Sequence, residues 1–355
     1  MKAESLEGFC AGQGINIVEA MQKIDDNAKG ILFILDADKR VVGSLSDGDI
    51  RRWLIRTGDL KADVAVIMNR DLKFGYSGGE ENALAHMRKQ KIKAMPIVDA
   101  DRHIIKILFD SDGAGELMPG RNTKLKGVPV VIMAGGEGTR LYPYTKILPK
   151  PLIPIGDIPI MERIIGKFVE YGVEDYYVTV NYKKGMIKSY FTELCPEYSV
   201  SYVEEDKPLG TAGSLRLIDK KFGQPVFVTN CDILINTDYA NLYDYHQKSG
   251  NLMTIVTALK NIVVPYGVLK SREQGIVTSM EEKPKLSYFV NTGMYILNPE
   301  VIGMIPGDRM FHMTELAGEL LKKGNRVGMY PISEDSFLDM GEFEEMKRME
   351  EKLDL

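Results

Sequence analysis

The sequence predicts an α/β fold whose larger part is a doubly wound, mixed and mostly parallel sheet. Apolar runs alternate with helix-like segments from residue 128 to residue 230, which is the order of repeated β-α units. The first run, VPVVIMA at 128–134, is continuously apolar and stops at glycines, as in a parallel strand buried on both faces. The first 118 residues instead contain a duplicated pattern, so we expect two structural parts.

The alternating segments define the elements of the larger part. We expect strands at residues 128–134, 176–180, 199–204 and 226–230, with helices at 158–171, 184–193 and 212–221. After Asp232 the pattern is mixed, and we expect strands at 253–259, 267–270 and 290–297, with helices at 313–323 and 342–352. This change predicts a second, α+β lobe.

The duplication appears when residues 33–50 (FILDADKRVVGSLSDGDI) are aligned with residues 96–113 (PIVDADRHIIKILFDSDG), an offset of 63. Each copy predicts a strand, an Asp-containing turn and a second strand, preceded by a helix at 15–24 or 80–89, which is a βαββ unit. A glycine-rich, basic segment at 113–127 lacks periodicity. We therefore predict a duplicated domain at 1–118, a linker at 119–127 and a main domain at 128–355.

Composition excludes several classes of protein. A net charge of −5 without a basic stripe argues against nucleic-acid binding. The three cysteines have no CxxC spacing and the four histidines no metal-ligand spacing, so we expect neither disulfides nor zinc, and structural or surface histidines. No apolar run of about 18 residues and no signal peptide are apparent, so we expect no membrane partner and a cytoplasmic location.

The segment GGEGTRLYPYTKILPKP, residues 135–151, directly follows the first buried strand. In a parallel sheet, ligands bind at the carboxyl ends of the strands. Adjacent glycines let main-chain N–H groups approach a triphosphate, and Arg140, Lys146 and Lys150 supply positive charge for phosphoryl chemistry. The segment matches neither the G-x-G-x-x-G dinucleotide pattern nor the Walker G-K-[ST] pattern.

The same segment resembles the signature of the sugar-phosphate nucleotidyltransferases, GG-x-GTRL-x-P-x-T-x-x-x-PKP. The resemblance implies a Rossmann-like, GT-A-like domain that makes a nucleotide-sugar and pyrophosphate from a nucleoside triphosphate and a sugar-1-phosphate. It also implies that Arg140 and Lys150 are catalytic and contact the triphosphate. The nucleotide-binding residues it implies in this segment are Ala134, Gly135, Gly136, Gly138 and Thr139.

Two further motifs carry the resemblance toward the nucleotide and its metal. PLGTAGS at 208–214 resembles the family's second glycine-rich element, which implies that Gly210, Thr211 and Gly213 receive the base and ribose. Asp232, after VFVTN, and Asp339, in LDMGEF, resemble the family's metal-binding aspartates and imply Mg²⁺. The residues alone also fit a helix cap at PLGTAGS, a strand-end turn at Asp232 and a cap at Asp339.

The motifs EEKP (281–284) and NTGMY (291–295) resemble the family's sugar-phosphate site. This implies a catalytic Lys283 on the sugar phosphate, with sugar-phosphate-binding residues Gly267, Glu282, Lys283, Asn291 and Thr292. A charged run such as EEKPK alone also fits a solvated turn. Cys231 stands where many family members have glycine, and we interpret it as a packing residue.

The duplicated domain resembles a tandem CBS pair, in which GSLSDGDI (43–50) is close to the family's G-x-x-T-x-x-D-[IL] element. The resemblance implies that Ser46 and Asp49 contact a regulatory adenine nucleotide. The second copy has Lys106 and Phe109 at the glycine and hydroxyl positions and keeps only Asp112, so at most one such site is expected. A purely structural or dimer-forming pair fits equally, and we expect a homo-oligomer.

The combined motifs look most like the CBS-linked guanylyltransferases of legionaminic acid synthesis. That likeness implies GTP and glucosamine-1-phosphate as substrates and GDP-glucosamine, a precursor of surface glycans, as product. Mannose- or heptose-1-phosphate with GTP, or glucose-1-phosphate with dTTP, UTP or CTP, remain alternatives. A nucleotide-sensing CBS protein with an inactive transferase domain is an alternative of a different class.

Overall fold

A computed structural model describes residues 6–27, 29–90, 92–109, 123–307, 309–341 and 343–352. The chain divides into two compact units. The N-terminal unit comprises Met1–Met118 with Asn261–Tyr288, and the C-terminal unit comprises Pro119–Lys260 with Phe289–Leu355. Most of the predicted linker and Asp112 lie outside the described residues, so the division at 118 and 127 stays a prediction.

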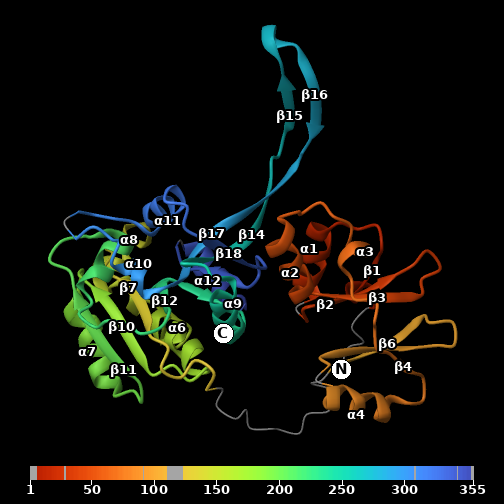
Figure 1. Cartoon of the computed structure of the whole chain (residues 1–355), viewed down its shortest axis with the longest axis horizontal. Helices are drawn as coiled ribbons and strands as arrows, with labels where there is room; N and C mark the ends of the chain where they lie inside the picture. The colour runs from red at the N-terminus through yellow and green to blue at the C-terminus, as the bar shows by residue number, and fades with distance from the viewer. Residues whose placement is uncertain are drawn as a thin grey trace. The chain divides into compact units, whose positions relative to one another are not determined.

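The N-terminal unit contains two βαββ modules of the same topology (Figure 1). In each, the first strand runs parallel to the second and the third antiparallel to it. The first module is β1 (Cys10–Gly12), α1 (Ile17–Asn27), β2 (Ile31–Leu35) and β3 (Val41–Ser46), followed by α2 (Asp47–Thr57) and α3 (Val64–Ile67). The second is β4 (Gly75–Tyr76), α4 (Glu80–Gln90), β5 (Ala94–Val98) and β6 (Ile104–Phe109).

The two modules repeat each other down to the turn between their last strands. Asp36 Oδ1 accepts the main-chain N–H groups two and four residues ahead, at 3.0 and 2.9 Å, and Asp99 Oδ1 does the same at 2.9 and 2.8 Å. Lys39 and Arg102, 63 positions apart, both have positive φ. Buried side chains from both modules then form one core, made of Phe9, Phe33, Val41, Ala94, Val98 and Ile107.

The C-terminal unit is built on a seven-stranded sheet with strand order β11-β10-β7-β12-β17-β14-β18. Strands β11, β10, β7 and β12 are mutually parallel, whereas β17 runs antiparallel to β12, and β14 runs parallel to β18. The strands are β7 (Val130–Ala134), β10 (Asp175–Val180), β11 (Ser199–Glu204), β12 (Val226–Asn230), β14 (Met253–Val263), β17 (Lys285–Leu297) and β18 (Val327–Ile332). This is the mixed, mostly parallel sheet that the sequence predicts.

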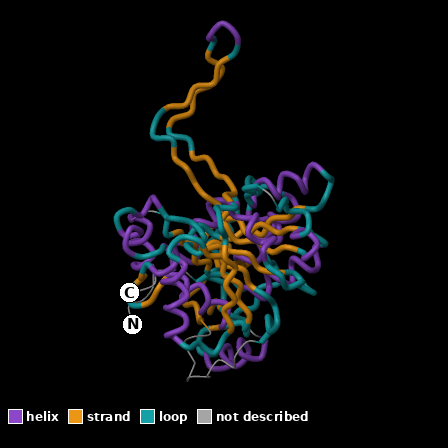
Figure 2. The backbone as a smooth tube through the Cα atoms, turned by 90° about the vertical axis from the view of Figure 1, so that its left-hand side faces the viewer, coloured by secondary structure: helices purple, strands orange, loops and turns teal. Residues whose placement is uncertain are grey.

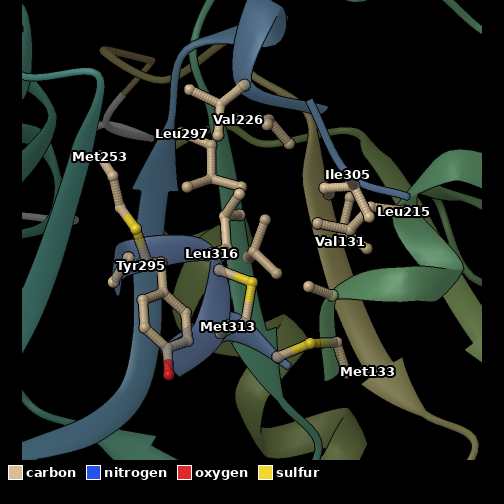
Figure 3. Packing of buried hydrophobic residues seen from close by; sticks show 14 of the residues in the cluster. Val131, Met133, Leu215, Val226, Met253, Tyr295, Leu297, Ile305, Met313 and Leu316 are labelled. Atoms are coloured by element: carbon tan, nitrogen blue, oxygen red, sulfur yellow. The ribbon is translucent and has the colours of Figure 1, made fainter. Parts of the chain in front are cut away.

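Helices cover both faces of this sheet. Adjacent residues of a strand point to opposite faces, so Val226 and Phe227 contact different helices. On one face, Phe227 packs against Phe168 and Tyr239, at ring distances of 5.2 and 6.1 Å. On the other, Val226 joins a core cluster with Met313 and Leu316 (Figure 3). The helices are α5 (Tyr144–Ile147), α6 (Ile160–Val169), α7 (Lys184–Leu194), α8 (Gly210–Gly213), α9 (Tyr239–Ser249), α10 (Pro299–Ile302), α11 (Met313–Lys322) and α12 (Phe343–Lys352).

Two expectations from the sequence are wrong. The helix expected at 212–221 is instead the single turn α8 followed by a 3-10 turn at Ser214–Leu217. The main-chain N–H groups of Ala212 and Gly213 both donate to Phe311 O, so this segment is tied to a distant part of the chain. The described residues after Asp232 form no separate lobe, because β14, β17 and β18 continue the same sheet.

Short two-stranded ladders complete the described fold. They are β8 (Pro154–Ile155) with β9 (Ile158–Pro159), β13 (Ile233–Ile235) with β19 (Phe337–Asp339), and β15 (Gly267–Ser271) with β16 (Val277–Glu282). The β15–β16 hairpin ends in a helical turn at Glu273–Gly275 (Figure 2). Within the described residues, no helix has both the length and the apolar character needed to cross a bilayer.

Candidate functional site

The site lies where the parallel strands of the C-terminal unit end. The carboxyl ends of β7, β10, β11 and β12 meet at one edge of the sheet, because these strands are parallel. A cavity of about 400 Å³ opens at this edge. Its lining residues are Met133, Gly135, Gly136, Gly138, Arg140, Lys150, Thr179, Glu205, Pro208, Gly210, Thr211, Asn230, Cys231, Asp232, Met310 and His312.

Glycines shape the wall of this first cavity. Gly138 has φ 68°, and a Cβ there would lie 3.0 Å from Thr145 Cγ2 and 3.2 Å from Lys150 Cβ. Thr145 Oγ1 donates to Gly138 O at 2.9 Å, which holds the loop against the segment that carries Lys150. A Cβ at Gly135 would lie 2.6 Å from Glu205 Oε1. A side chain at Gly138 would therefore be strained by the positive φ, and one at Gly135 would require the Glu205 side chain to move.

Among the residues predicted to bind the nucleotide, Ala134, Thr139 and Gly213 do not line this cavity. Ala134 is buried at the end of β7, Thr139 is exposed at the start of a 3-10 turn, and Gly213 is buried in α8. Lys146 also lies outside the cavity and is exposed, with its ammonium over the Tyr142 ring at 5.3 Å. The positive charge in the cavity wall therefore comes from Arg140 and Lys150.

Lys150 forms a buried ion pair with Asp232. The Lys150 residue is only 7% exposed, and its Nζ donates to Asp232 Oδ2. The two residues come from different elements, a 3-10 turn at Lys150–Leu152 and the segment that follows β12. Because a buried ammonium is stable only beside compensating charge, each residue depends on the other in this state.

Asp339 joins Asp232 through the ladder of β13 with β19. Ile233 pairs with Asp339, and Met340 N donates to Asp232 O at 2.8 Å. Burial raises the pKa of the Asp339 carboxyl and the Asp232 charge raises it further, while Lys150 and Arg140 oppose both effects. Two adjacent carboxylates are oxygen donors of the kind that Mg²⁺ prefers, so this pair fits a divalent cation. The described residues contain no group of three metal-ligating side chains.

A second cavity, of about 310 Å³, adjoins the first. The two share Arg140, Thr211, Asn230, Asp232 and His312. The second is also lined by Ile233, Asn291, Thr292, Gly293, Tyr295, Thr314, Phe337 and Asp339. The antiparallel register explains this meeting: Met294 pairs with Thr229, so the residues just before Met294 lie beside those just after Thr229.

Asn291 and Thr292 therefore lie in the site as expected, although they follow Asp232 by about 60 residues. Thr292 Oγ1 donates to Val256 O at 2.8 Å, and Asn291 Nδ2 donates to the Tyr295 hydroxyl at 2.7 Å. Gly293 has φ 89°, and a Cβ there would lie 2.5 Å from Asn230 Nδ2. The NTGMY motif thus fits closely against the end of β12.

Gly267, Glu282 and Lys283 do not line either cavity. Gly267 pairs with Glu282 in the β15–β16 hairpin, and Lys283 N donates to Tyr266 O at 3.2 Å. Lys283 has φ 48°, which is unusual for a residue with a side chain. These three residues therefore lie close to one another at the base of the hairpin strands, outside the lining of both cavities.

Several residues of the site were not predicted from the sequence. Glu205, the second of two adjacent glutamates, is buried and accepts Leu209 N–H through Oε2 at 3.1 Å. Burial raises the pKa of its carboxyl. Its place directly after the strand at 199–204 was a usable signal. His312 had none, because it reaches the cavity from a segment 100 residues beyond the PLGTAGS motif.

Cys231 is buried in the wall of the first cavity beside Asp232. Burial, together with the Asp232 charge, raises the pKa of its thiol to about 12. A thiol with this pKa is protonated at neutral pH and is a weak nucleophile. The interpretation of Cys231 as a packing residue agrees with this environment.

The N-terminal unit has a cavity of its own, of about 400 Å³. Ser46 and Asp49 line it together with Lys29, Lys73 and Lys93. The Ser46 and Asp49 side chains also form the capping box of α2. In the second module, Phe109 packs on Phe9 with ring centroids 5.3 Å apart, so an aromatic pair replaces the hydroxyl there.

A glycine-rich loop, a buried lysine and paired carboxylates at the carboxyl edge of a parallel sheet form the arrangement of an α/β nucleotide-binding protein. Residues 129–354, more than half of the chain, match the family model described as "Nucleotidyl transferase". The chain therefore belongs to the nucleotidyl transferase family.

Three known proteins illustrate this similarity. Mannose-1-phosphate guanyltransferase of Debaryomyces hansenii is 36% identical over 184 residues, 49% of this chain and 51% of that protein. UTP–glucose-1-phosphate uridylyltransferase of Synechocystis sp. is 33% identical over 233 residues, 59% of each. The solved structure of HddC from Yersinia pseudotuberculosis has a TM-score of 0.51 and 26% identity, covering 64% of this chain and 99% of its own. The chain thus spans about half to three-fifths of the curated relatives it matches.

Proposed function

We propose that this protein is a sugar-1-phosphate nucleotidyltransferase. The observation that carries the proposal is the meeting of two cavities at Arg140 and Asp232, with Lys150 beside them. Transfer between two phosphorylated substrates needs two pockets whose phosphate ends adjoin. Two relatives are named as transferases for mannose-1-phosphate and glucose-1-phosphate, which supports the class of sugar-1-phosphate nucleotidyltransferases.

The proposed reaction is an in-line displacement. A phosphate oxygen of the sugar-1-phosphate attacks the α-phosphorus of the nucleoside triphosphate and forms a new P–O bond. The bond from the α-phosphorus to the bridging oxygen of the β-phosphate breaks, and pyrophosphate leaves with that electron pair. The nucleophile is already an anion, so no general base is required, and catalysis depends on alignment and charge.

The proposed role of each residue follows from the cavity that it lines. Main-chain N–H groups of the Gly135–Gly138 loop and the Gly210 turn hold the nucleotide in the first cavity. Arg140 and Lys150 stabilise charge on the reacting phosphates. Asn291 and Thr292 line the second cavity, which takes the sugar-1-phosphate. Asp232 and Asp339 would hold Mg²⁺, which neutralises phosphate charge when bound.

We propose GTP and glucosamine-1-phosphate as the substrates, giving GDP-glucosamine, with Gly267, Glu282 and Lys283 of the hairpin contributing to sugar-phosphate binding. The sequence likeness to CBS-linked guanylyltransferases supports this choice, and the mannose-1-phosphate guanyltransferase relative supports GTP alone. Mannose- or heptose-1-phosphate with GTP, and glucose-1-phosphate with UTP, dTTP or CTP, are the alternatives that the test must separate.

The test is pyrophosphate release with Mg²⁺, measured for four nucleoside triphosphates against a panel of sugar-1-phosphates. We expect turnover with at least one pair, and the highest kcat/KM with GTP and glucosamine-1-phosphate. A higher kcat/KM with another pair would replace the substrate assignment. Absence of turnover with every pair would reject the transferase proposal and favour a nucleotide sensor.

We also propose that the N-terminal cavity binds the phosphate of one adenine nucleotide per chain. Lys29 and Lys93 supply positive charge and the Ser46 hydroxyl can donate a hydrogen bond to the phosphate, whereas the Asp49 carboxylate can only accept, as from a ribose hydroxyl. The Phe9–Phe109 pair supports a single site rather than two. Calorimetric titration with AMP and ATP should give a stoichiometry near one, and Asp49→Asn should weaken binding. Absence of heat for both nucleotides would leave the unit a structural role.

A further inference from the structure

The segment just before α11 is tied to the Gly210 turn by main-chain hydrogen bonds. Phe311 N donates to Leu209 O at 2.8 Å, and Phe311 O accepts from Ala212 N and Gly213 N at 2.9 and 3.1 Å. Met313 N donates to Thr211 Oγ1 at 3.0 Å. His312 lies between these anchor points, so its main chain is held at the rim of the first cavity.

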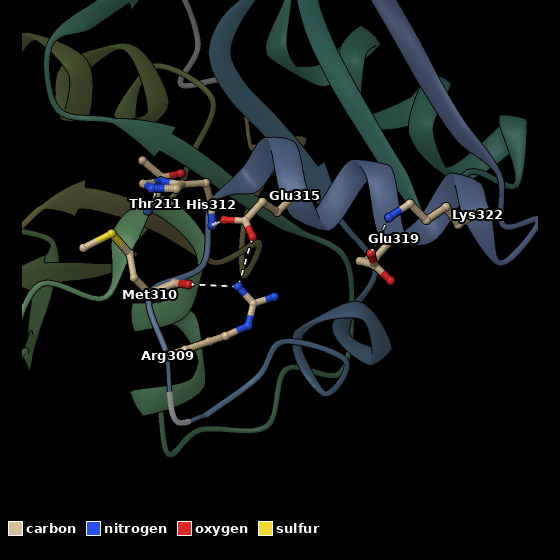
Figure 4. Close-up of polar contacts among 7 residues, drawn as sticks. All are labelled: Thr211, Arg309, Met310, His312, Glu315, Glu319 and Lys322. Atoms are coloured by element: carbon tan, nitrogen blue, oxygen red, sulfur yellow. Dashed lines mark hydrogen bonds and ion pairs between the residues drawn. The ribbon is translucent and has the colours of Figure 1, made fainter.

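The His312 ring is held as well as its main chain (Figure 4). Thr211 N donates to His312 Nδ1 at 3.4 Å. Gly210 has φ 78°, and a Cβ there would lie 3.1 Å from the His312 ring and 2.7 Å from Phe311 O. On the other side, Glu315 Oε1 accepts His312 N–H at 3.1 Å, while Glu315 Oε2 pairs with Arg309 at 3.0 Å.

These contacts fix which ring nitrogen can donate. The main-chain N–H of Thr211 is a donor, so Nδ1 must be unprotonated to accept it. In the neutral ring the proton is then on Nε2, and Nε2–H is the donor that the ring offers. His312 lines both cavities, together with Arg140, Thr211, Asn230 and Asp232.

We propose that His312 is a substrate-contacting residue whose Nε2–H donates to a phosphate oxygen where the two cavities meet. The inference rests on the proposed function, because that function places the α-phosphate of the nucleoside triphosphate at this junction. A neutral, oriented donor there strengthens its hydrogen bond as negative charge develops on the transferring phosphate. His312 thereby adds a neutral hydrogen-bond donor to the positive charges of Arg140 and Lys150, which belong to an earlier segment of the chain.

A pair of isosteres separates this role from a structural one. In His312→Gln the amide nitrogen can occupy the position of Nε2, so the donor is retained. In His312→Asn the amide oxygen can occupy the position of Nδ1, so the Thr211 acceptor is retained and the donor is lost. Thermal unfolding verifies that both variants fold. His246→Gln is not a suitable control, because His246 is buried and bonds through both ring nitrogens. The control is His86→Gln, since His86 lies in the N-terminal unit and lines neither cavity of the C-terminal unit.

We expect His312→Asn to lower kcat/KM for pyrophosphate release by about 10²-fold, and His312→Gln to stay within about tenfold of the wild type. Nucleoside triphosphate binding, measured by calorimetry, should weaken about tenfold in His312→Asn alone. This binding readout tests the contact even if the wild type turns over no substrate pair, a result that would reject the proposed function separately. Equal loss in both variants, unchanged activity in both, or loss in His312→Gln alone would overturn the proposal.

Discussion

At the residue scale, the site depends on one buried cation and its partner. Lys150 contacts Asp232 in the cavity wall, while Lys146, four positions earlier, is exposed and outside the cavity. The same short segment therefore contains one lysine that lines the cavity and one that is exposed outside it. The family signature includes Lys150 and has a variable position at Lys146, and the fold of the loop shows where each side chain lies.

Replacing these two lysines tests the distinction. Lys150→Ala should lower pyrophosphate release by about 10²- to 10³-fold, because it removes charge stabilisation at the transferring phosphate. Lys146→Ala should stay within about twofold, as for a surface substitution. Steady-state kinetics on both variants, with circular dichroism to verify folding, gives the comparison. Equal losses in the two variants would contradict the assignment.

The adjacent glutamates Glu204 and Glu205 have opposite electrostatic environments. Hydrogen bonds from Lys184 and Lys188 lower the pKa of exposed Glu204 to about 2, whereas burial raises the pKa of Glu205. Glu204 thus stabilises the fold above the unfolded-state pKa, and this contribution disappears as the pH falls through the folded-state pKa. For Glu205 the sign is reversed, and its stabilisation is lost as the pH rises through its raised pKa.

Neutral isosteres should therefore shift the melting temperature in opposite directions. At pH 8, Glu205→Gln should raise Tm by on the order of 2 °C and Glu204→Gln should lower it slightly. The Glu205→Gln difference should shrink toward pH 4, where protonation makes the Glu205 carboxyl neutral like the glutamine amide. Thermal unfolding of both variants between pH 4 and 8 measures this, and a lower Tm for Glu205→Gln at pH 8 would refute the assignment of its pKa.

At the element scale, the site is held by the fit of α8 against the start of α11. Gly210 permits this fit, because its positive φ and the nearby Phe311 O leave no room for a side chain. The helix expected at 212–221 is a single turn, and its first N–H groups donate to Phe311 O. Helix periodicity in sequence cannot indicate a partner that lies 100 residues away.

Gly210→Ala should therefore destabilise the fold by about 1–3 kcal/mol and weaken nucleotide binding. Gly318→Ala, inside α11, is the matched control, because a Cβ at Gly318 meets nothing within 4 Å. That control should gain about 0.5–1 kcal/mol from helix propensity. Urea unfolding compares the two, and similar free energies of unfolding for Gly210→Ala and the wild type would show that the contact with Phe311 can relax.

At the scale of the whole molecule, the family match falls on residues 129–354, and the structural similarity to HddC covers 64% of this chain. Since HddC is covered over 99% of its own length, a chain without an N-terminal duplicated unit can adopt this fold. The N-terminal unit has its own core and its own cavity. We therefore expect catalysis to depend on the C-terminal unit and any response to a regulatory nucleotide to depend on the N-terminal unit.

A fragment spanning residues 119–355 should fold and retain pyrophosphate release. It should also lose the calorimetric response to adenine nucleotides that the full chain is proposed to give. The full chain assayed in parallel is the control. An inactive but folded fragment would mean that the N-terminal unit contributes to catalysis, and an unfolded fragment would mean that the two units depend on each other for stability.

The sequence by itself determined the parallel strands, the glycine-rich loop and the family, because these depend on local patterns: continuous apolar runs, adjacent glycines and a long contiguous motif. It also indicated Arg140, Lys150, Asp232, Asn291, Thr292 and Asp339. The tertiary structure alone decided that β17 runs antiparallel beside β12 and that Glu205 and His312 line the site. The physical reason is that strand pairing and close packing join residues far apart in the chain, and no local pattern encodes those partners.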